Sequence, residues 1–496
     1  METELSTKSH KILFLNTLAF TVCFAAWMLN GVLVTFLVDN GVFQWDAVKI
    51  GWLLGIPVLT GSIFRLPVGI LTDKFGGKWV FGLLLILCSV PMFLLSTAHD
   101  FISFALLSFG FGLVGTGFAV GIAFTSVWYP KKWQGTALGI FGTGNAGAAL
   151  TTLCAPALLG KLTDHGASLE GWRNLPKIYA AVLLAMGLIF LLFATNKKPT
   201  RHGKNFRQTL ATLKEVRVWR FGLYYFLVFG CFVALSQWLV PYYLNVYSVS
   251  LVTAGLFASI FSLPSGLIRA LGGWMSDYWG ARRVMYWVLG LSTACCFLLI
   301  FPRMDIFSPG KGIMAKTSGI VSEVSEEQIL VEDKAYALTS KKERPHSYED
   351  QLLIFPTKET WQEPMVKAGD PVKKKQLLAR GVTHIYFQAN IWIATALIFL
   401  VGLVWGVGKA AVYKHIPEYF PNEVGLVGGM VGVLGGLGGF FGPVIFGYLL
   451  KLSGLWTSLW MFLTVLSVLS LLWMHRTVQK LMQKEVPELM TRLERQ

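Results

Sequence analysis

The stretch RLPVGILTD occupies residues 65–73, and a related stretch, RALGGWMSD, occupies residues 269–277. In both, an arginine precedes an aspartate by eight residues, and the copies are offset by 204 residues, from 65 to 269 and from 73 to 277. DKFGGK follows the first copy at 73–78, and DYWGARR follows the second at 277–283. A repeat at one fixed offset predicts a chain built from two equivalent halves in parallel.

The composition places these halves in a lipid bilayer. Of 496 residues, 54% are hydrophobic and only 14% are charged, and the mean hydropathy is positive. A soluble domain needs more polar residues to cover its surface. The formal net charge of +16 could indicate nucleic acid binding, but the basic residues lie mostly in short loops between apolar runs. A nucleic-acid partner is therefore not expected.

Apolar runs of about 20 residues, the length that crosses a bilayer, occur twelve times. The predicted spans are 12–37, 50–72, 79–97, 101–129, 135–160, 177–195, 220–245, 251–275, 284–302, 385–413, 424–450 and 455–474. The first is too long for a signal peptide and lacks a convincing cleavage site, so we expect it to be retained. The sequence thus predicts an all-α polytopic membrane protein with twelve transmembrane helices in two pseudo-symmetric six-helix halves.

Basic residues in short loops set the orientation of such a protein. The loops expected in the cytoplasm carry Lys74 and Lys78, Lys131 and Lys132, Arg282 and Arg283, and Lys414, and the tail from Arg476 joins them. Both termini are then cytoplasmic, in a multi-pass protein of the cell (inner) membrane. The predicted parts are an N-terminal half (1–195), a cytoplasmic linker (196–219), helices seven to nine (220–302), an extracytoplasmic insert (303–383), and helices ten to twelve with a cytoplasmic tail (384–496).

The insert between helices nine and ten has a different pattern. Its GIVSEVSEEQILVED alternates in a way typical of strands joined by tight turns. Its MVKAGDPVKKKQLLARG resembles small β-sandwich hybrid modules related to biotinyl and lipoyl domains. We expect a small β-rich insert that is structured but carries no chemistry of its own.

The two repeated arginines are expected near the middle of the membrane. Asp73 and Asp277 belong to the loop motifs at the cytoplasmic edge, and eight helical residues place Arg65 and Arg269 about 12 Å deeper. A guanidinium there costs at least about 2.5–3.5 kcal/mol. No carboxylate lies inside another predicted span to offset that cost. The pair therefore predicts a substrate-anion site, and the forked guanidinium suits a planar oxyanion.

Helix five, ALGIFGTGNAGAAL at 137–150, and helix eleven, GLVGGMVGVLGGLGGFFGP at 425–443, are rich in glycine. Glycine lets neighbouring helices approach closely or slide, and close packing is the role expected for most of these positions. Asn145 differs, because an unpaired amide within a span is costly, so its side chain is expected to face the pathway. The signature glycines are Gly142, Gly144, Gly147, Gly435, Gly436, Gly438 and Gly439.

These segments resemble the nitrate/nitrite porter family, the NarK type, of the major facilitator superfamily. GTGNAGAA and GGLGGFFGP resemble its two signature segments, and residues 115–139 and 413–425 also fit. The resemblance covers all twelve helices and implies the major facilitator fold. It also implies that nitrate or nitrite lies between the two arginines. The residues that match this site are Arg65, Arg269, Asn145, Tyr225, Phe118 and Phe229.

The spacing of two of these residues agrees with that implication. Tyr225 and Phe229 are four apart and so lie on one helical face, where a hydroxyl and a ring can both meet a small ligand. For each ring alone, ordinary core packing is the alternative. Apolar rings would exclude water from the anion and strengthen the arginine contacts.

Two energy sources for transport are consistent with the sequence. An anion that neutralises the arginine pair would lower the barrier to rocking around a midplane site, which favours exchange of nitrate for nitrite. Proton-coupled nitrate uptake needs a titratable group, and Lys409 in GVGKAAVYK is the candidate, since like charge nearby disfavours its charged form. This lysine departs from the small or polar residues that the resemblance implies for exchangers. The sequence favours proton symport, with nitrate/nitrite antiport as the alternative; a structural role for Lys409 stays open.

Other classes of function fit less well. A facilitator for another small anion would keep both arginines, and a nitrate sensor would bind without turnover, although no signalling domain is appended. An enzyme is not expected, because a nucleotide-binding GxxxxGK[ST], a metal-ligand cluster and a nucleophile triad are missing. The six cysteines lie in apolar segments without zinc spacing. We expect no cofactor and no metal, and a monomer in the lipid bilayer with nitrate, nitrite and protons as its small partners.

Overall fold

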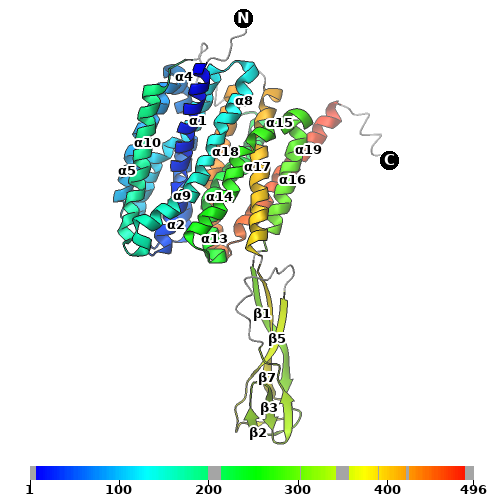
Figure 1. The fold of residues 1–496 in the computed structure, drawn as a ribbon. Helices are drawn as coiled ribbons and strands as arrows, with labels where there is room; N and C mark the ends of the chain where they lie inside the picture. The colour runs from blue at the N-terminus through cyan, green and yellow to red at the C-terminus, as the bar shows by residue number, and fades with distance from the viewer. Residues whose placement is uncertain are drawn as a thin grey trace. The chain divides into compact units, whose positions relative to one another are not determined.

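The computed structural model describes residues 7–198, 214–301, 303–341, 357–388, 390–420 and 424–485. The chain divides into two compact units: Met1–Leu298 with Leu397–Gln496, and Leu299–Ala396. The first unit is a bundle of helices (Figure 1). The second contains all the described strands together with the first residues of helix α17.

Helices cover all six spans predicted in the first half. The first two are α1 (Thr7–Trp27) with α2 (Leu29–Asp39), and α3 (Ala47–Ile63) with α4 (Arg65–Phe75). The third and fourth are α5 (Gly77–Leu94) with η1 (Leu95–Thr97), and α6 (Phe101–Phe111) with η2 (Gly112–Thr116) and α7 (Gly117–Trp128). The last two are α8 (Lys131–Gly142) with η3 (Thr143–Ala146) and α9 (Gly147–Leu162), and the short η4 (Asp164–Gly166) and η5 (Leu169–Arg173) with α10 (Asn174–Phe193).

The second half repeats this pattern. It consists of α12 (Val216–Tyr225) with η7 (Phe226–Cys231) and α13 (Phe232–Tyr247), α14 (Leu251–Leu267) with α15 (Arg269–Trp279), α16 (Ala281–Leu298), α17 (Ile391–Tyr419), α18 (Val424–Ser453) and α19 (Ser458–Glu485). Within the described residues, eight helices are long and apolar enough to cross a membrane, or ten if each of two bent pairs counts as one span. Of the remaining predicted spans, 135–160 is helical as α8–η3–α9, and 284–302 is helical as far as Leu298, where α16 ends.

One predicted helix boundary was wrong. The sequence placed the start of the tenth span at residue 385, but strand β7 continues to Gln388 and α17 begins at Ile391. The segment HIYFQANIW is mostly apolar and aromatic. Hydrophobicity alone does not separate the end of a strand from the start of a helix in so short a run.

The two halves pack closely at one end of the bundle, which we call the Asp46 end. A Cβ added at Gly51 of α3 would overlap the carbonyl of Pro443 in α18, and one added at Gly447 would overlap the carbonyl of Ala47. Asp46 caps α3 by accepting a hydrogen bond from the Lys49 amide at 2.9 Å. Its other carboxylate oxygen accepts a bond from Lys451 at 2.9 Å, so the same side chain joins both halves.

The opposite end of the bundle, which we call the Asp73 end, carries α4 and α15 (Figure 1). Halfway between the ends, the helices depart from regular α geometry. The α3–α4 pair is bent by 41° and the α14–α15 pair by 46°. The segments η2 and η3 are 3₁₀ turns, and η7 is a π-helix. Such irregular turns concentrate at functional sites because they re-aim side chains inside a helix.

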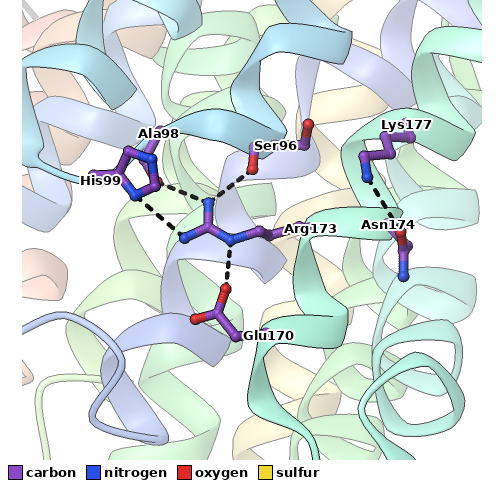
Figure 2. A network of polar contacts seen from close by, with 7 residues as sticks. All are labelled: Ser96, Ala98, His99, Glu170, Arg173, Asn174 and Lys177. Carbon is purple, nitrogen blue, oxygen red and sulfur yellow. Dashed lines mark hydrogen bonds and ion pairs between the residues drawn. The ribbon is translucent and has the colours of Figure 1, made fainter.

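Arg173 illustrates how this protein holds a structural arginine (Figure 2). Its Nη1 donates to the carbonyls of Ser96 at 2.7 Å and Ala98 at 3.1 Å, and its Nε donates to Glu170 at 2.5 Å. The guanidinium lies 4.7 Å from the ring centroid of Trp172. The side chain therefore satisfies carbonyls that the end of a helix leaves free, and its charge is paired.

The second unit consists of two antiparallel sheets. Its strands are β1 (Arg303–Met314), β2 (Gly319–Val324), β3 (Gln328–Val331), β4 (Lys334–Ala337), β5 (Thr357–Pro364), β6 (Pro371–Val372) and β7 (Leu377–Gln388). One sheet has the order β1-β7-β5 and the other β4-β3-β2-β6. A core of ten buried side chains stabilises the unit: Ala315, Val321, Ile329, Val331, Tyr336, Leu338, Val366, Val372, Leu378 and Ala379.

Candidate functional site

The two repeated arginines lie at the bends of their spans. Arg65 is the first residue of α4 and Arg269 is the first residue of α15, directly after the turn residues Phe64 and Ile268. Helical hydrogen bonds continue on both sides of each turn residue, from Phe64 to Thr60 and from Val68 to Phe64 in the first half. Each half therefore presents a guanidinium at a bend in a continuous span.

Both guanidiniums lie beside one aromatic ring. The Cζ atoms of Arg65 and Arg269 are each 5.5 Å from the ring centroid of Phe118 in α7. Arg65 is also 5.3 Å from the ring of Phe229, which stacks on Phe118 with centroids 6.2 Å apart. The structure thus brings together four of the predicted site residues, two from each half.

The hydrogen-bonding capacity of the arginines is largely unused. Arg65 is only 4% exposed, and its Nη1 donates to the carbonyl of Gly432 in α18 at 2.7 Å. Its Nε and Nη2, and the Nη1 of Arg269, are buried without a hydrogen-bond partner in the described part of the chain. Neither side chain has a carboxylate partner there, in contrast to Arg173, which pairs with Glu170. Buried guanidinium N–H groups in this state need an acceptor.

Asn145 and Tyr225 also carry buried polar groups without partners among the described residues. Asn145 in η3 is 0% exposed, and both atoms of its amide lack a partner among the described residues. Tyr225 ends α12, and its ring stacks on Phe229 with centroids 4.9 Å apart, as their spacing of four predicts. Its hydroxyl is buried and makes no hydrogen bond of acceptable geometry within the described chain.

Glycines give each arginine room against the opposite half. Gly432 and Gly436 of α18 lie beside Arg65, and a Cβ at Gly436 would be 3.3 Å from its Nη1 and would overlap Ser62. Gly142, at the end of α8, lies beside Arg269, with a Cβ there 3.4 Å from its Cδ. Two of the signature glycines therefore border the site directly.

The other signature glycines pack helix against helix. In α9 and the preceding η3, a Cβ at Gly144 would overlap Phe20 of α1, and one at Gly147 would overlap the carbonyl of Thr21. In α18, a Cβ at Gly435 would overlap the ring of Tyr225. The remaining two glycines of α18 contact η7 and the helices around it: Gly438 lies against Phe226 and Gly230, and Gly439 against Val58 and Val233.

Lys409 lies in the middle of α17 and is fully buried. Its Nζ donates to Ser265 of α14 at 3.1 Å and lies 3.1 Å from the ring centroid of Phe232. The charge of Arg269 acts against the charge of its ammonium. Lys409 has no acidic partner among the described residues, so the same region that holds two arginines also holds a third basic group without a counter-ion.

The sequence did not identify several residues at this site. Tyr413 makes an edge contact with Tyr225 at 5.0 Å, and its ring is 5.9 Å from the Arg269 guanidinium. Trp27 lies 5.8 Å from Arg65. The spacing of four between Lys409 and Tyr413 could have indicated a shared face of α17. Nothing in the sequence indicated that Trp27 would lie at the site.

The two loop aspartates, Asp73 and Asp277, do not belong to the arginine site. Asp277 pairs with Lys414 at 2.5 Å, and both side chains are largely exposed. Asp73 is half-buried near the end of α4. Both aspartates are eight residues beyond the arginines, at the Asp73 end of the bundle.

Comparison with known proteins identifies the family to which the chain belongs. The sequence pattern of the Major Facilitator Superfamily matches residues 15–317 and 377–489, leaving out most of the insert. A Thermus thermophilus protein named "Probable nitrate/nitrite antiporter NarK1" is 38% identical over 485 residues, 97% of this chain and 94% of that protein. A "Probable nitrate transporter NarT" of Staphylococcus epidermidis is 25% identical over 462 residues, 93% of this chain and 95% of its own length.

Among solved structures, a bacterial homolog of the human lysosomal transporter Spinster, in an inward-facing and occupied conformation, superposes with a TM-score of 0.64. It shares 13% sequence identity over 96% of this chain and 97% of that one, so it shows the fold alone. These matches confirm the predicted major facilitator fold. The protein is a multi-pass membrane transporter rather than an enzyme. The chain belongs to the nitrate/nitrite porter family, the NarK type, of the major facilitator superfamily.

Proposed function

We propose that this protein is a secondary active transporter that takes up nitrate with protons, and that it also carries nitrite. One observation supports the substrate class above all. Two repeat-related arginines approach the same ring, Phe118, and three of their nitrogen atoms are buried without acceptors. The names of the relatives, a nitrate/nitrite antiporter and a nitrate transporter, support nitrate and nitrite among the small anions.

In this proposal the anion lies between Arg65 and Arg269. A planar oxyanion can accept paired N–H bonds from each guanidinium, which a lysine cannot supply. Asn145 and Tyr225 would donate further bonds from the two halves. The rings of Phe118 and Phe229 would exclude water, which strengthens the charge interactions.

Alternating access follows from the same arrangement. The anion would neutralise charge on both halves at once, so the halves could close around it, whereas an empty site would resist closing. We place the Asp46 end outside the cytoplasm and both termini inside it, following the basic residues of the loops. The tight packing of Gly51 and Gly447 against the other half would then close the outer side.

Lys409 is the proposed carrier of the coupling proton. It is buried, has no acidic partner among the described residues, and is opposed by the charge of Arg269. A group in that setting can release its proton when the site is empty of anion and bind it again when nitrate arrives. Exchange of nitrate for nitrite is the second candidate, and it is favoured by the name of the Thermus thermophilus relative.

Uptake by purified protein in liposomes tests this function. The internal anion and the pH gradient are varied independently, with acid outside. Symport predicts nitrate uptake into nitrite-free vesicles that is driven by the pH gradient, whereas a strict requirement for internal nitrite would rule symport out in favour of exchange.

The site is tested in the same vesicles. Arg65→Lys and Arg269→Lys keep the positive charge but lose the planar guanidinium with its paired N–H donors, and each should abolish uptake. Arg173→Lys is the matched control, because it changes an arginine whose bonds are structural and should leave uptake intact. Near-normal uptake by either site variant would overturn the proposed anion clamp.

A further inference from the structure

A second basic hollow lies at the Asp73 end of the C-terminal half. It is partly open to solvent, the space that it encloses is about 20 Å³, and it is lined by α12, α16, α17 and α19. Its main polar side chains are Arg220, Tyr224, Arg282 and Tyr419. None of the described residues that line it belongs to the proposed nitrate site.

The charges around this hollow are unbalanced. Arg217 and Arg220 are the second and fifth residues of α12, and Arg282 is the second residue of α16. Arginine in the first turns of a helix is unfavourable, because the helix N-terminus is itself partially positive. Two such N-termini meet here, and none of the described residues lining the hollow is acidic.

Among the described side chains, the nearby acids do not compensate this charge. Glu215, which precedes α12, is exposed and makes no capping hydrogen bond. Asp277, just before α16, pairs with Lys414. Arg217 lies 5.5 Å over the ring of Tyr419 at the edge of the hollow.

One buried donor at the hollow lacks an acceptor, and a buried guanidinium there lacks a counter-ion among the described residues. Arg220 is 8% exposed and lies 5.3 Å from the ring of Phe221, and it forms no ion pair within the described chain. Tyr224 is 2% exposed, and its hydroxyl has no hydrogen-bond partner among the described residues. Arg282 donates to the hydroxyl of Tyr419 at 2.9 Å. Buried donors of this kind cost free energy unless an acceptor reaches them.

We propose that this hollow binds an oxyanion of the phosphate type, either free phosphate or the phosphate of an anionic phospholipid headgroup. The guanidiniums of Arg220 and Arg282 and the hydroxyl of Tyr224 would donate to its oxygens, and the N-termini of α12 and α16 would stabilise its charge. The bound anion would hold these first turns against the last turn of α17. This site is separate from the proposed nitrate site and does not depend on it.

Thermal unfolding of the purified full-length protein in detergent tests the proposal. The midpoint is measured against inorganic phosphate, with sodium chloride keeping the ionic strength constant, and separately against a soluble short-chain phosphatidylglycerol. At least one of them should raise the midpoint of the wild type. Arg220→Gln should remove the rise, and Tyr224→Phe, which removes only a hydroxyl, should raise the half-effective concentration about tenfold or more.

Arg65→Gln is the matched control, since it alters the nitrate site and should leave the rise unchanged. A response to phosphate alone identifies a free-anion site, and a response to the phospholipid alone identifies a headgroup site; each supports the proposal. No rise with either probe overturns it. A rise that survives both hollow variants, or that disappears with Arg65→Gln, also overturns it, because the anion would then bind elsewhere.

Discussion

Replacing Lys409 with methionine separates proton coupling from anion binding. Methionine has similar length and no charge, so the variant removes the bond to Ser265 and the contact with Phe232 without opening a large cavity. A desolvated cation over a ring contributes about 2 kcal/mol. A hydrogen bond from a charged group contributes about 1.5–3 kcal/mol.

These gains oppose the cost of burying an ammonium, which is several kcal/mol. The variant should therefore fold with a stability within about 2 kcal/mol of the wild type. Its nitrate binding should persist, because the arginines are untouched. Only the coupling should be lost.

The size of that loss follows from the driving force. One pH unit is worth about 1.4 kcal/mol per proton, so electroneutral uptake of one proton with one nitrate can concentrate nitrate about tenfold. The assay is the steady-state ratio of internal to external nitrate in nitrite-free liposomes with acid outside. The wild type should approach that ratio, and Lys409→Met should stay near unity.

Two further variants define what Lys409 does. Ser265→Ala removes the same hydrogen bond but keeps the amine, and it should retain accumulation. Lys409→Arg keeps a charge that cannot be released and should lose accumulation. If Lys409→Met still concentrated nitrate as the wild type does, the lysine would not carry the proton and its role would be structural.

Four other predictions concern packing and stability. Asn145→Leu removes an amide with no partner among the described residues, so the unfolding midpoint should rise while nitrate uptake falls; lower stability with normal uptake would contradict this. A Cβ at Gly435 would overlap the ring of Tyr225, so Gly435→Ala should raise the KM for nitrate. Gly428→Ala should not, because its Cβ would be 3.5 Å from its nearest neighbour. Equal KM values for the two variants would refute the claim that Gly435 positions Tyr225. Asp46→Ala should lower thermal stability by about 1 kcal/mol more than Lys451→Ala, because it removes a helix cap as well as an exposed ion pair, and equal losses would argue against the cap. Because the hydrogen bond from Lys451 holds the pKa of the Asp46 carboxyl below its usual range, the stability from this pair should persist at neutral pH and disappear only as the pH falls through that lowered pKa, which unfolding midpoints across acid pH can check.

The repeat made the main features of the site predictable. An arginine eight residues before a loop aspartate, found twice at one offset, indicates two helices with a charged group at the same depth. The expectation that no carboxylate would offset these charges rested only on the absence of acidic residues from the other spans. These inferences need the order of residues and helical rise, and no knowledge of side-chain packing.

The contacts between the halves could not be predicted in that way. Nothing in the sequence pairs Arg65 with the Gly432 carbonyl, because any residue offers that carbonyl and only the close approach of α18 brings it near. The bend before Arg65 has a local cause, because Pro67 cannot donate a hydrogen bond to the Ile63 carbonyl. The bend before Arg269 has leucine, Leu271, at the equivalent position and could not be predicted in this way. Tyr413 shares a helical face with Lys409, but many aromatic residues in a bundle have such a neighbour.

Equilibrium binding of nitrate to the purified protein tests the anion clamp most directly. Binding needs no gradient and no assumption about orientation. The account predicts one nitrate per chain, with affinity lowered at least about tenfold by Arg65→Lys and likewise by Arg269→Lys, since each removes a forked pair of hydrogen bonds to the charged ligand. Unchanged nitrate affinity in either folded variant would contradict the claim that the anion lies between these two arginines.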